Sequence, residues 1–447
     1  MPPFFSIVAM TATVETSSPI APPAAAGAWL TASALTVADQ AVVSGTRFAV
    51  ALIVGRTCGA DDLGILALGF SLLFLVAAVQ DSLILRPFVV YGNRMDGQQL
   101  RTYTGGALLQ YMAVAGLAGV VLAAVAGVFT AMAKLAPLAP MVGTLAGTVP
   151  GFLLAEFCRR VSLARVRARA ALLLDSAVAV VQLSALLVLA WRGLLTPALA
   201  FGVTGGVSLL GGAAWLLASR RDLCFVAAAL PDALRRNWRF GRWALAGAVI
   251  ALVHGYALGW FLAVRFDTEA TGRLSAAQQL VNLSNPFILS IGTVLGPRAV
   301  RALLLGGSWQ LRRVVGRAAA LLAAVLAAFC GGLALTGDQL FGLYRVSFPG
   351  QTATLVLLAL GTLAAGVGAA ATEGLYALER SDVDWKSNLV GLAMVAVAAP
   401  TLIVAWDLPG AAAAMLLGLV ASAVVKWFVF LGASGRNRVL AAASVKS

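Results

Sequence analysis

Runs of apolar residues long enough to cross a lipid bilayer recur along nearly the whole chain. A helix needs roughly 20 such residues to span the ~30 Å hydrocarbon layer. Of the 447 residues, 61% are apolar and 11% are charged, whereas soluble domains have about 45–50% apolar and about 25% charged residues. No water-soluble core could bury this surplus. The sequence therefore predicts an all-α integral membrane protein, and it excludes a secreted enzyme, a disulfide scaffold, a disordered protein and an ordinary cytosolic enzyme.

Twelve transmembrane helices are expected, six in each half of the chain. A basic segment, 220–242, separates the halves and is expected to be a cytoplasmic linker. It would join an N-terminal lobe, 34–219, to a C-terminal lobe, 243–433, with a disordered tail at 1–33 and a cytoplasmic tail at 434–447. The predicted spans are 34–55, 64–85, 104–133, 136–157, 170–191, 194–218, 243–264, 274–296, 314–336, 352–378, 388–406 and 409–432.

Lys and Arg residues cluster in alternate loops. The loops after spans two, four, six, eight and ten, together with the C-terminal tail, carry 24 of the 32 Lys and Arg residues, and the opposite loops carry 6. Cytoplasmic loops of membrane proteins are enriched in these residues. The bias predicts that both termini are cytoplasmic and that the chain is a multi-pass protein of the cytoplasmic (inner) membrane. It also accounts for the net charge of +14, so nucleic acid is not an expected partner.

Signatures of enzymes and metal sites are missing from the sequence. There is no G-x-x-x-x-G-K-[ST] phosphate-binding loop, and a single His cannot form an HExxH motif. The four Cys residues are scattered without the spacing of metal ligands. We therefore expect no enzyme activity, no metal and no cofactor other than a coupling ion, H⁺ or Na⁺.

The two halves of the chain repeat each other. Arg56 and Arg265 are 209 residues apart, and Gly64 and Gly272 are 208 apart. The segments QLRTYTG and QLRRVVG are related by an offset of 211. Six spans in each half, with equal orientation, indicate parallel repeats, and transporters built from repeats bind substrate between them. We therefore expect a substrate site between the two lobes.

One face of the first predicted span is polar. Thr36, Gln40, Ser44 and Arg47 fall within about 80° of one another at 100° per residue, and Arg47 lies near mid-depth. A charged group in hydrocarbon costs about 2.5 kcal/mol or more, so such residues usually face the bundle interior or a water-filled path. This stripe is predicted to line a cavity.

The second half carries matching polar residues. On the eighth span a second stripe is formed by Ser275, Gln278, Asn282 and Asn285. His254 in the seventh span lies 207 residues after Arg47. The equivalent first helices of the two repeats thus each place a potential cation at mid-depth. We expect a central, electropositive cavity lined by spans one, two, seven and eight.

A guanidinium group binds phosphate oxygens through two hydrogen bonds and stays charged, so this cavity suits a phosphate-bearing substrate. Arg56 and Arg265 would stand at its outer mouth. The alternative is that these residues join helices or, for the two mouth arginines, extend to the membrane surface. The candidate substrate-binding residues are Gln40, Arg47, Arg56, His254, Arg265, Gln278, Asn282 and Asn285.

Carboxylates at membrane depth suggest energy coupling. A carboxylate shielded from water can exchange a proton or bind Na⁺ as conformations alternate. Asp39 and Glu373 are the candidates for this role, and Asp81 and Asp175 also lie at or near membrane depth. The alternative is that a neighbouring arginine neutralises each carboxylate.

Local motifs in both halves resemble a known family. The segment 39–48 (DQAVVSGTRF), then Gly55-Arg56 and 59–64 (GADDLG), resembles the first helix pair of Wzx-type polysaccharide (O-antigen and exopolysaccharide) flippases. The segment 269–272 (EATG), with the long span that ends at Pro297, is similar to the span seven to eight region of that family. These flippases belong to the multidrug/oligosaccharidyl-lipid/polysaccharide exporter superfamily.

The resemblance implies a V-shaped pair of six-helix lobes around a cationic cavity. It implies a flippase, not an enzyme, that moves polyprenyl-pyrophosphate-linked oligosaccharides to the outer leaflet by alternating access for cell-surface polysaccharide biosynthesis, driven by an ion gradient. Arg56 matches the arginine that ends the first span of the family. Membrane lipids, a polysaccharide polymerase and glycosyltransferases are the implied partners.

Two other readings stay open. A cation-coupled small-molecule (multidrug) antiporter would use a carboxylate in the first span, where Asp39 stands. It would export cations, for which a cavity rich in acidic and aromatic residues is expected. A membrane enzyme or scaffold for glycan synthesis would need a catalytic constellation or a large soluble region, and the sequence contains neither.

Overall fold

The computed structural model describes residues 23–92, 95, 97–165, 167–226, 230–345 and 350–444, and these residues form helices without any strand. The predicted all-α class is confirmed. Residues 1–22 of the predicted N-terminal tail and 445–447 of the C-terminal tail lie outside the described residues. The remainder of both tails is helical, because the first helix begins at Pro23 and the last ends at Ser444.

The first half of the chain builds one lobe from helices that follow each other through short loops. A π-helical segment, η1, joins α2 to α3 within one continuous apolar stretch, Ala60–Gly92. The elements are α1 (Pro23–Cys58), α2 (Ala60–Gln80), η1 (Asp81–Leu85), α3 (Arg86–Gly92), α4 (Gly97–Ala131), η2 (Ala136–Leu138), α5 (Ala139–Ala164), α6 (Ala168–Trp191) and α7 (Pro197–Ala218).

The second half builds the other lobe, and two of its helices are broken. Gly307 interrupts α10 with a φ of 63°, and Asp407 interrupts α12 with a φ of 54°. The elements are η3 (Arg220–Asp222), α8 (Leu230–Arg265), α9 (Thr268–Val281), η5 (Asn282–Ser284), α10 (Asn285–Tyr344), α11 (Gln351–Ala377) and α12 (Asp382–Ser444).

Ten helices of the described residues are long and apolar enough to cross a membrane, which makes the chain a multi-pass membrane protein. Two of these, Leu295–Tyr344 with 50 residues and Asp382–Gly435 with 54, are far longer than the roughly 20 residues of one crossing. Both contain one of the breaks described above. The count of twelve spans requires each arm of a broken helix to cross separately, and it stays a prediction.

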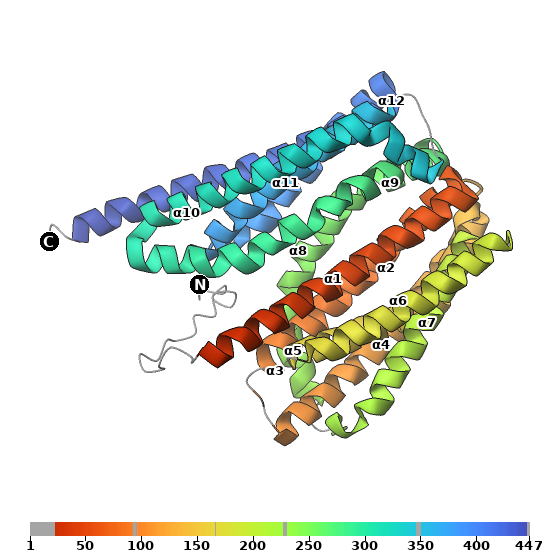
Figure 1. The fold of residues 1–447 in the computed structure, drawn as a ribbon, viewed down its shortest axis with the longest axis horizontal. Helices are drawn as coiled ribbons and strands as arrows, with labels where there is room; N and C mark the ends of the chain where they lie inside the picture. The colour runs from red at the N-terminus through yellow and green to blue at the C-terminus, as the bar shows by residue number, and fades with distance from the viewer. Residues whose placement is uncertain are drawn as a thin grey trace.

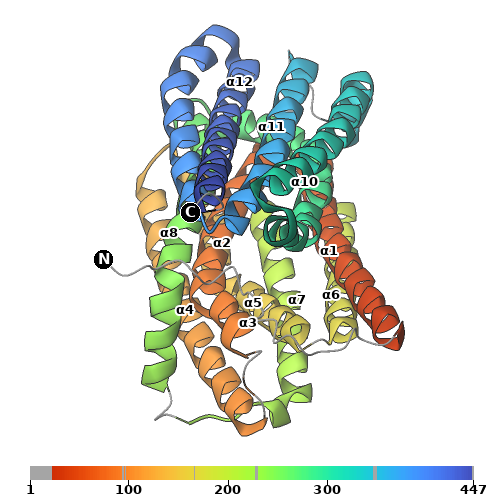
Figure 2. The same cartoon turned by 90° about the vertical axis from the view of Figure 1, so that its left-hand side faces the viewer.

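The lobes converge at one end and diverge toward the end where α1 begins and α12 ends (Figure 1). Helices α1 to α7 lie in one lobe and α9 to α12 in the other. Helix α8 runs along both, beside α4 at one end and beside α12 at the other (Figure 2). This arrangement is the V expected from the resemblance.

The first part of α8 is attached to the N-terminal lobe. The Tyr103 hydroxyl donates a hydrogen bond of 2.8 Å to Asn237 Oδ1, and Asn237 Nδ2 donates one of 2.8 Å to Gln110 Oε1. Gly241 packs on the Ser82 carbonyl so closely that a Cβ would overlap it. The predicted linker 220–242 is therefore helical from Leu230 onward and forms one continuous helix with the first span of the second lobe.

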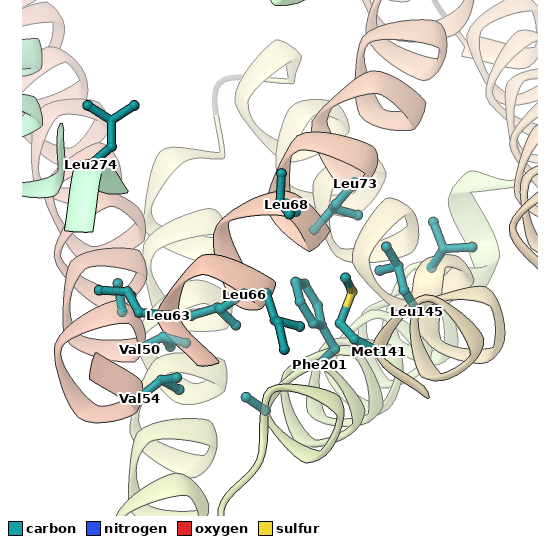
Figure 3. Packing of buried hydrophobic residues seen from close by; sticks show 14 of the residues in the cluster. Val50, Val54, Leu63, Leu66, Leu68, Leu73, Met141, Leu145, Phe201 and Leu274 are labelled. Carbon is teal, nitrogen blue, oxygen red and sulfur yellow. The ribbon is translucent and has the colours of Figure 1, made fainter. Parts of the chain in front are cut away.

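The core of the N-terminal lobe is packed around α2. Gly69 provides the space for the Met141 side chain of α5 and the Phe201 ring of α7, which both lie where its Cβ would be. Leu66 and Leu145 beside them are fully buried (Figure 3). In a membrane, helices gain little from leaving lipid, so close packing at small residues supplies much of the association energy.

Candidate functional site

The two lobes meet most closely where α2 crosses α9, at the closed end of the V. Gly64 and Gly272 face each other there, and a Cβ on either would overlap a backbone carbonyl, of Thr268 or of Ala60 respectively. The Thr268 hydroxyl donates a hydrogen bond to Asp61 Oδ1 beside this crossing. The repeat-related glycines of the sequence thus form the contact between the repeats.

Two further contacts fasten the closed end. Lys134 Nζ, after α4, donates a hydrogen bond of 3.2 Å to the Val264 carbonyl near the end of α8. The Tyr344 ring at the end of α10 packs where a Cβ of Gly55 on α1 would lie, and it contacts Phe48 edge to face at 6.3 Å between ring centroids.

Between the lobes, next to this closure, lies a cavity of about 490 Å³. Its walls come from α1, α2, α8, α9, η5 and the start of α10, which correspond to the predicted spans one, two, seven and eight. Four of the predicted substrate-binding residues line it, namely Arg47, Gln278, Asn282 and Asn285. The structure therefore brings the two polar stripes of the sequence to one chamber, which we call the central cavity.

Arg47 is the single charged residue among the described lining residues of the central cavity. Its side chain is exposed to the cavity, and Cζ lies 5.1 Å from the ring centroid of Phe74. The structure records no ion pair between Arg47 and any described carboxylate. A guanidinium held against an aromatic face without an acidic partner can bind an anion in the cavity.

Four aromatic rings of the described residues also line the central cavity. They are those of Phe48, Phe70, Phe74 and Tyr256. Phe74 lies between two of them, with centroid distances of 5.8 Å to Phe70 and 6.0 Å to Tyr256. The cavity therefore offers one cation, several amides and a row of three contacting aromatic rings, Phe70, Phe74 and Tyr256.

Four other predicted substrate-binding residues lie outside the central cavity. Gln40 Nε2 donates a hydrogen bond of 3.3 Å to the Ser44 hydroxyl, one turn from the cavity wall. Arg56 and Arg265 are exposed at the ends of α1 and α8, on the closed side. His254 is buried against α12, where its ring fills the space beside Gly391 and Gly418. The repeat relation to Arg47 places His254 on an equivalent helix, but its side chain faces away from the cavity.

Asp39 belongs to a charged network inside the N-terminal lobe. It is fully buried, and its Oδ2 accepts a hydrogen bond of 3.3 Å from Arg159 Nη1 of α5. Arg159 also pairs with Glu156 at 2.7 Å and with Asp175 of α6 at 3.8 Å. In this conformation Asp39 is thus compensated by an arginine, which is the alternative that the sequence left open.

The network extends to the end of α2, and three of its members, Glu156, Arg159 and Asp175, line a second cavity. Arg160 pairs with Glu156 at 2.9 Å and with Asp81 at 3.6 Å, and Asp81 pairs with Arg86 at 2.6 Å. Beside the network lies a cavity of about 130 Å³ within the lobe, lined by residues of α1, α2, α5, α6 and α7. We call it the lobe cavity.

Most of this network is absent from the sequence-based prediction because the fourth predicted span ends at 157, which places Arg159 and Arg160 in a loop. Helix α5 continues to Ala164. The spacing of Glu156, Arg159 and Arg160, i, i+3 and i+4, puts all three on one helix face and was the available signal.

Glu373, the other predicted coupling residue, lies on α11 in the second lobe. It is partly buried, and its Oε2 lies close to Gly296 of α10. The structure records no ion pair of Glu373 with any described residue. Within the described parts of the chain, no group of His, Cys, Asp and Glu has an arrangement that could hold a metal ion.

Comparison with known proteins finds the same fold in solved structures of membrane transporters. No protein-family profile matches the chain, and no curated protein matches it. Among solved structures, the inward-facing conformation of a multidrug resistance MATE family transporter of the MOP superfamily has a TM-score of 0.74 at 14% identity, covering 90% of this chain and 95% of that chain.

Two further solved structures are similar over the same length. The outward-facing conformation of a multidrug resistance MATE family transporter has a TM-score of 0.65 at 15% identity, over 92% of this chain and 96% of that chain. The lipid II flippase MurJ in an inward closed conformation has a TM-score of 0.70 at 11% identity, over 92% and 91%. The chain therefore has the fold of MOP superfamily transporters and flippases.

Proposed function

We propose that the protein is a flippase that moves a polyprenyl-pyrophosphate-linked oligosaccharide across the cytoplasmic membrane. The observation that carries this proposal is Arg47, which has no recorded ion pair and is the one charged residue among the described lining residues of the central cavity. A cation at membrane depth costs several kcal/mol unless a ligand, water or a nearby opposite charge compensates it, and a pyrophosphate that enters the central cavity is a matching ligand.

The other walls fit the other parts of such a substrate. The amides of Gln278, Asn282 and Asn285 can donate and accept hydrogen bonds with sugar hydroxyls. Phe70 and Phe74 offer apolar faces on which sugar rings pack. A volume of about 490 Å³ lies within the usual range of ligand sites. The lipid tail would remain in the bilayer, outside the cavity.

The proposed direction follows from charge and closure. With both termini cytoplasmic, as the distribution of Lys and Arg predicts, the closed α2–α9 crossing faces outward and the conformation is inward-facing. The higher TM-score to the inward-facing relative, 0.74 against 0.65, supports this assignment. Transport would then open the crossing and release the substrate in the outer leaflet.

Coupling to an ion gradient is part of the proposal. Asp39 and Glu373 are the proposed coupling residues, one in each lobe, for H⁺ or Na⁺. The likeness to the lipid II flippase supports a lipid-linked substrate. A polysaccharide polymerase and glycosyltransferases of the same pathway, in the inner membrane, are the proposed protein partners.

The deciding experiment measures the pool of polyprenyl-pyrophosphate oligosaccharide in membranes of a strain that lacks this gene. We expect the intermediate to accumulate, wild type to clear it and Arg47→Ala to fail. The matched control is Arg192→Ala, because Arg192 follows α6, is exposed and stacks on Trp191 away from both cavities. An unchanged pool in the deletion strain would refute the flippase function.

A second candidate is a small-molecule antiporter. The aromatic wall and the likeness to multidrug transporters favour it, whereas the lack of acidic residues among the described lining residues disfavours export of cations. Accumulation of a cationic dye in the same deletion strain distinguishes the two. Greater dye accumulation with an unchanged lipid pool would select the antiporter.

A further inference from the structure

The charged network of the N-terminal lobe holds one more carboxylate than it holds guanidinium groups. Six ion pairs connect its members without a gap. The carboxylates are those of Asp39, Asp81, Glu156 and Asp175, and the guanidinium groups are those of Arg86, Arg159 and Arg160. With all groups ionised the network carries one uncompensated negative charge at membrane depth, where such a charge is costly.

Arg47 is placed to compensate this charge. It lines the lobe cavity together with Glu156, Arg159 and Asp175, and it also lines the central cavity. No other charged residue among the described lining residues is shared by the two cavities. Arg47 contacts the ring of Phe74 and has no recorded ion pair. Its guanidinium can therefore interact either with an anion in the central cavity or with the carboxylates beside the lobe cavity.

Two oxygens of the network have no hydrogen-bond partner among the described residues. They are Asp39 Oδ1 and Asp175 Oδ2, and both are buried. The two carboxylates contact the same arginine, Arg159, at 3.3 Å and 3.8 Å. A buried carboxylate oxygen without a donor is a site at which a proton can be held when the surrounding positive charge is withdrawn.

We propose that Arg47 links the binding of a diphosphate in the central cavity to the uptake of one proton by the Asp39–Asp175 pair. The inference rests on the proposed function and deepens it. In the empty protein the charge of Arg47 balances the network. When phosphate oxygens bind the guanidinium, the network loses this balance. A proton from water then bonds to a free carboxylate oxygen, and it leaves again when the diphosphate dissociates.

The other charged and titratable groups around the pair do not replace Arg47. Glu156 of α5 forms ion pairs with Arg159 and Arg160, and Asp81 of η1 forms one with Arg86. From α8, Tyr256 lines the central cavity together with Arg47. From α7, the residues that line the lobe cavity are Thr204 and Ser208, which are neutral.

The pH dependence of the affinity for diphosphate shows whether proton and diphosphate binding assist or oppose each other. A proton on the pair neutralises the network and frees Arg47, so proton and diphosphate assist each other. The affinity for diphosphate should therefore rise as the pH falls, by up to about tenfold per pH unit for one linked proton. An exchanger, in which proton and substrate compete, has the opposite sign.

Calorimetry on the purified full chain in detergent tests the link, with farnesyl diphosphate as the probe. Binding enthalpies in buffers of different ionisation enthalpy give the number of protons taken up per diphosphate. We expect an uptake between about 0.3 and 1 proton in wild type near neutral pH. Asp175→Asn should lose this uptake and bind the probe about threefold more tightly, because one negative charge that holds Arg47 is gone.

Controls distinguish proton uptake by the network from protonation of the ligand and from loss of folding. The proton change of the diphosphate itself is equal in both proteins, so the difference between them reports the pair. Glu269→Gln removes an exposed carboxylate that pairs only with Arg273 in the described structure, and it should keep the uptake of wild type. Asp39→Asn replaces Asp175→Asn should the latter fail to fold.

Each outcome decides. Probe binding with equal proton uptake in wild type and Asp175→Asn overturns the link and leaves the flippase function standing. Affinity that falls with acidification also overturns it, in favour of competition. Absence of probe binding at any pH removes the proposed substrate class and the link together.

Discussion

Gly64 of α2 and Gly272 of α9 face each other across the closed end, and the amide nitrogen of each lies 2.8 Å from the place where a Cβ of the other would be. The contact is reciprocal, because each glycine also abuts the carbonyl of the residue four positions before its partner, Thr268 or Ala60. The repeat offset of 208 that relates the two glycines in sequence thus relates two halves of one contact. Side chains at either position would keep the backbones apart.

Gly272→Ala should open the closed end. Its Cβ would overlap the Ala60 carbonyl, which cannot move without displacing α2. In a background without native Cys, we expect Ser275→Cys, inside the central cavity, to react several times faster with a membrane-impermeant maleimide added from outside. The control is Gly332→Ala, where a Cβ meets nothing within 4 Å. Equal labelling in both variants would mean that the crossing is not the gate.

A disulfide across the same end should lock it. Asp61 and Thr268 are hydrogen-bonded through their side chains, so Asp61→Cys with Thr268→Cys in the Cys-free background should oxidise readily. We expect clearance of the lipid-linked oligosaccharide to stop under oxidant and to recover with reductant. Each single Cys variant serves as control. Full transport by the cross-linked protein would show that the lobes need not separate here.

Arg47→Lys should not restore what Arg47→Ala removes. Charge-assisted hydrogen bonds contribute about 1.5–3 kcal/mol each, so losing them lowers transport by about tenfold or more. Lys keeps the charge but not the planar pair of donors that matches a phosphate. Initial rates of clearance of the lipid intermediate at matched protein levels measure the effect. Wild-type rates in the Lys variant would show that charge alone suffices.

Arg159→Ala should destabilise the N-terminal lobe strongly. The substitution leaves Asp39, Glu156 and Asp175 without the cation that all three contact, and breaking a buried ion pair costs about 3–5 kcal/mol. Thermal unfolding in detergent should show a clear drop in Tm. Adding Asp175→Asn should recover part of it, because one uncompensated charge is removed. A double variant no more stable than Arg159→Ala would argue against a shared network.

Glu379→Gly should stabilise the protein slightly. Glu379 lies between α11 and α12 with a φ of 59°, the left-handed region that costs a non-glycine residue about 1–2 kcal/mol. Its backbone N–H donates a hydrogen bond of 3.0 Å to the Tyr376 carbonyl, so the conformation is fixed by the turn. Glu379→Ala keeps the strain and is the control. The expected readout is a higher Tm for Gly only.

The central cavity could be predicted from helical periodicity. Arg47 lies on a polar face of α1 and Gln278, Asn282 and Asn285 on a polar face of the α9–η5 region, and a polar face in a membrane must meet either another polar face or water. The offset between repeats then indicated that the two helices meet. Both inferences depend on local spacing, which the sequence contains directly.

The direction of His254 could not be predicted in the same way. The offset places His254 on the helix equivalent to that of Arg47, but repeat symmetry fixes helix positions better than helix rotations. The ring of His254 fits between Gly391 and Gly418, and these lie more than 130 residues farther along the chain. Which face a helix turns to a distant partner is decided by such shape matches, which no local pattern contains.

The helical structure of the basic segment 220–242 could not be predicted from its charges either. Its charges indicate a cytoplasmic location, and they say little about whether the backbone is helical. Leu230 begins a helix because Asn237 finds buried amide and hydroxyl partners in α4, which supply the stabilisation that a short polar stretch lacks alone.

Helix α8 therefore connects the two lobes physically, because it packs against both of them. It contacts the first lobe at Asn237 and Gly241 and again at Trp260, whose indole N–H donates a hydrogen bond of 2.8 Å to the Ser71 hydroxyl, and it contacts the second lobe at His254. A rotation of one lobe against the other, as the proposed transport cycle requires, would therefore bend α8 or break one of these contacts. Between α1 and α10 the lobes are joined by packing, where the Tyr344 ring contacts Gly55 and Phe48, and they can separate there without bending a shared helix.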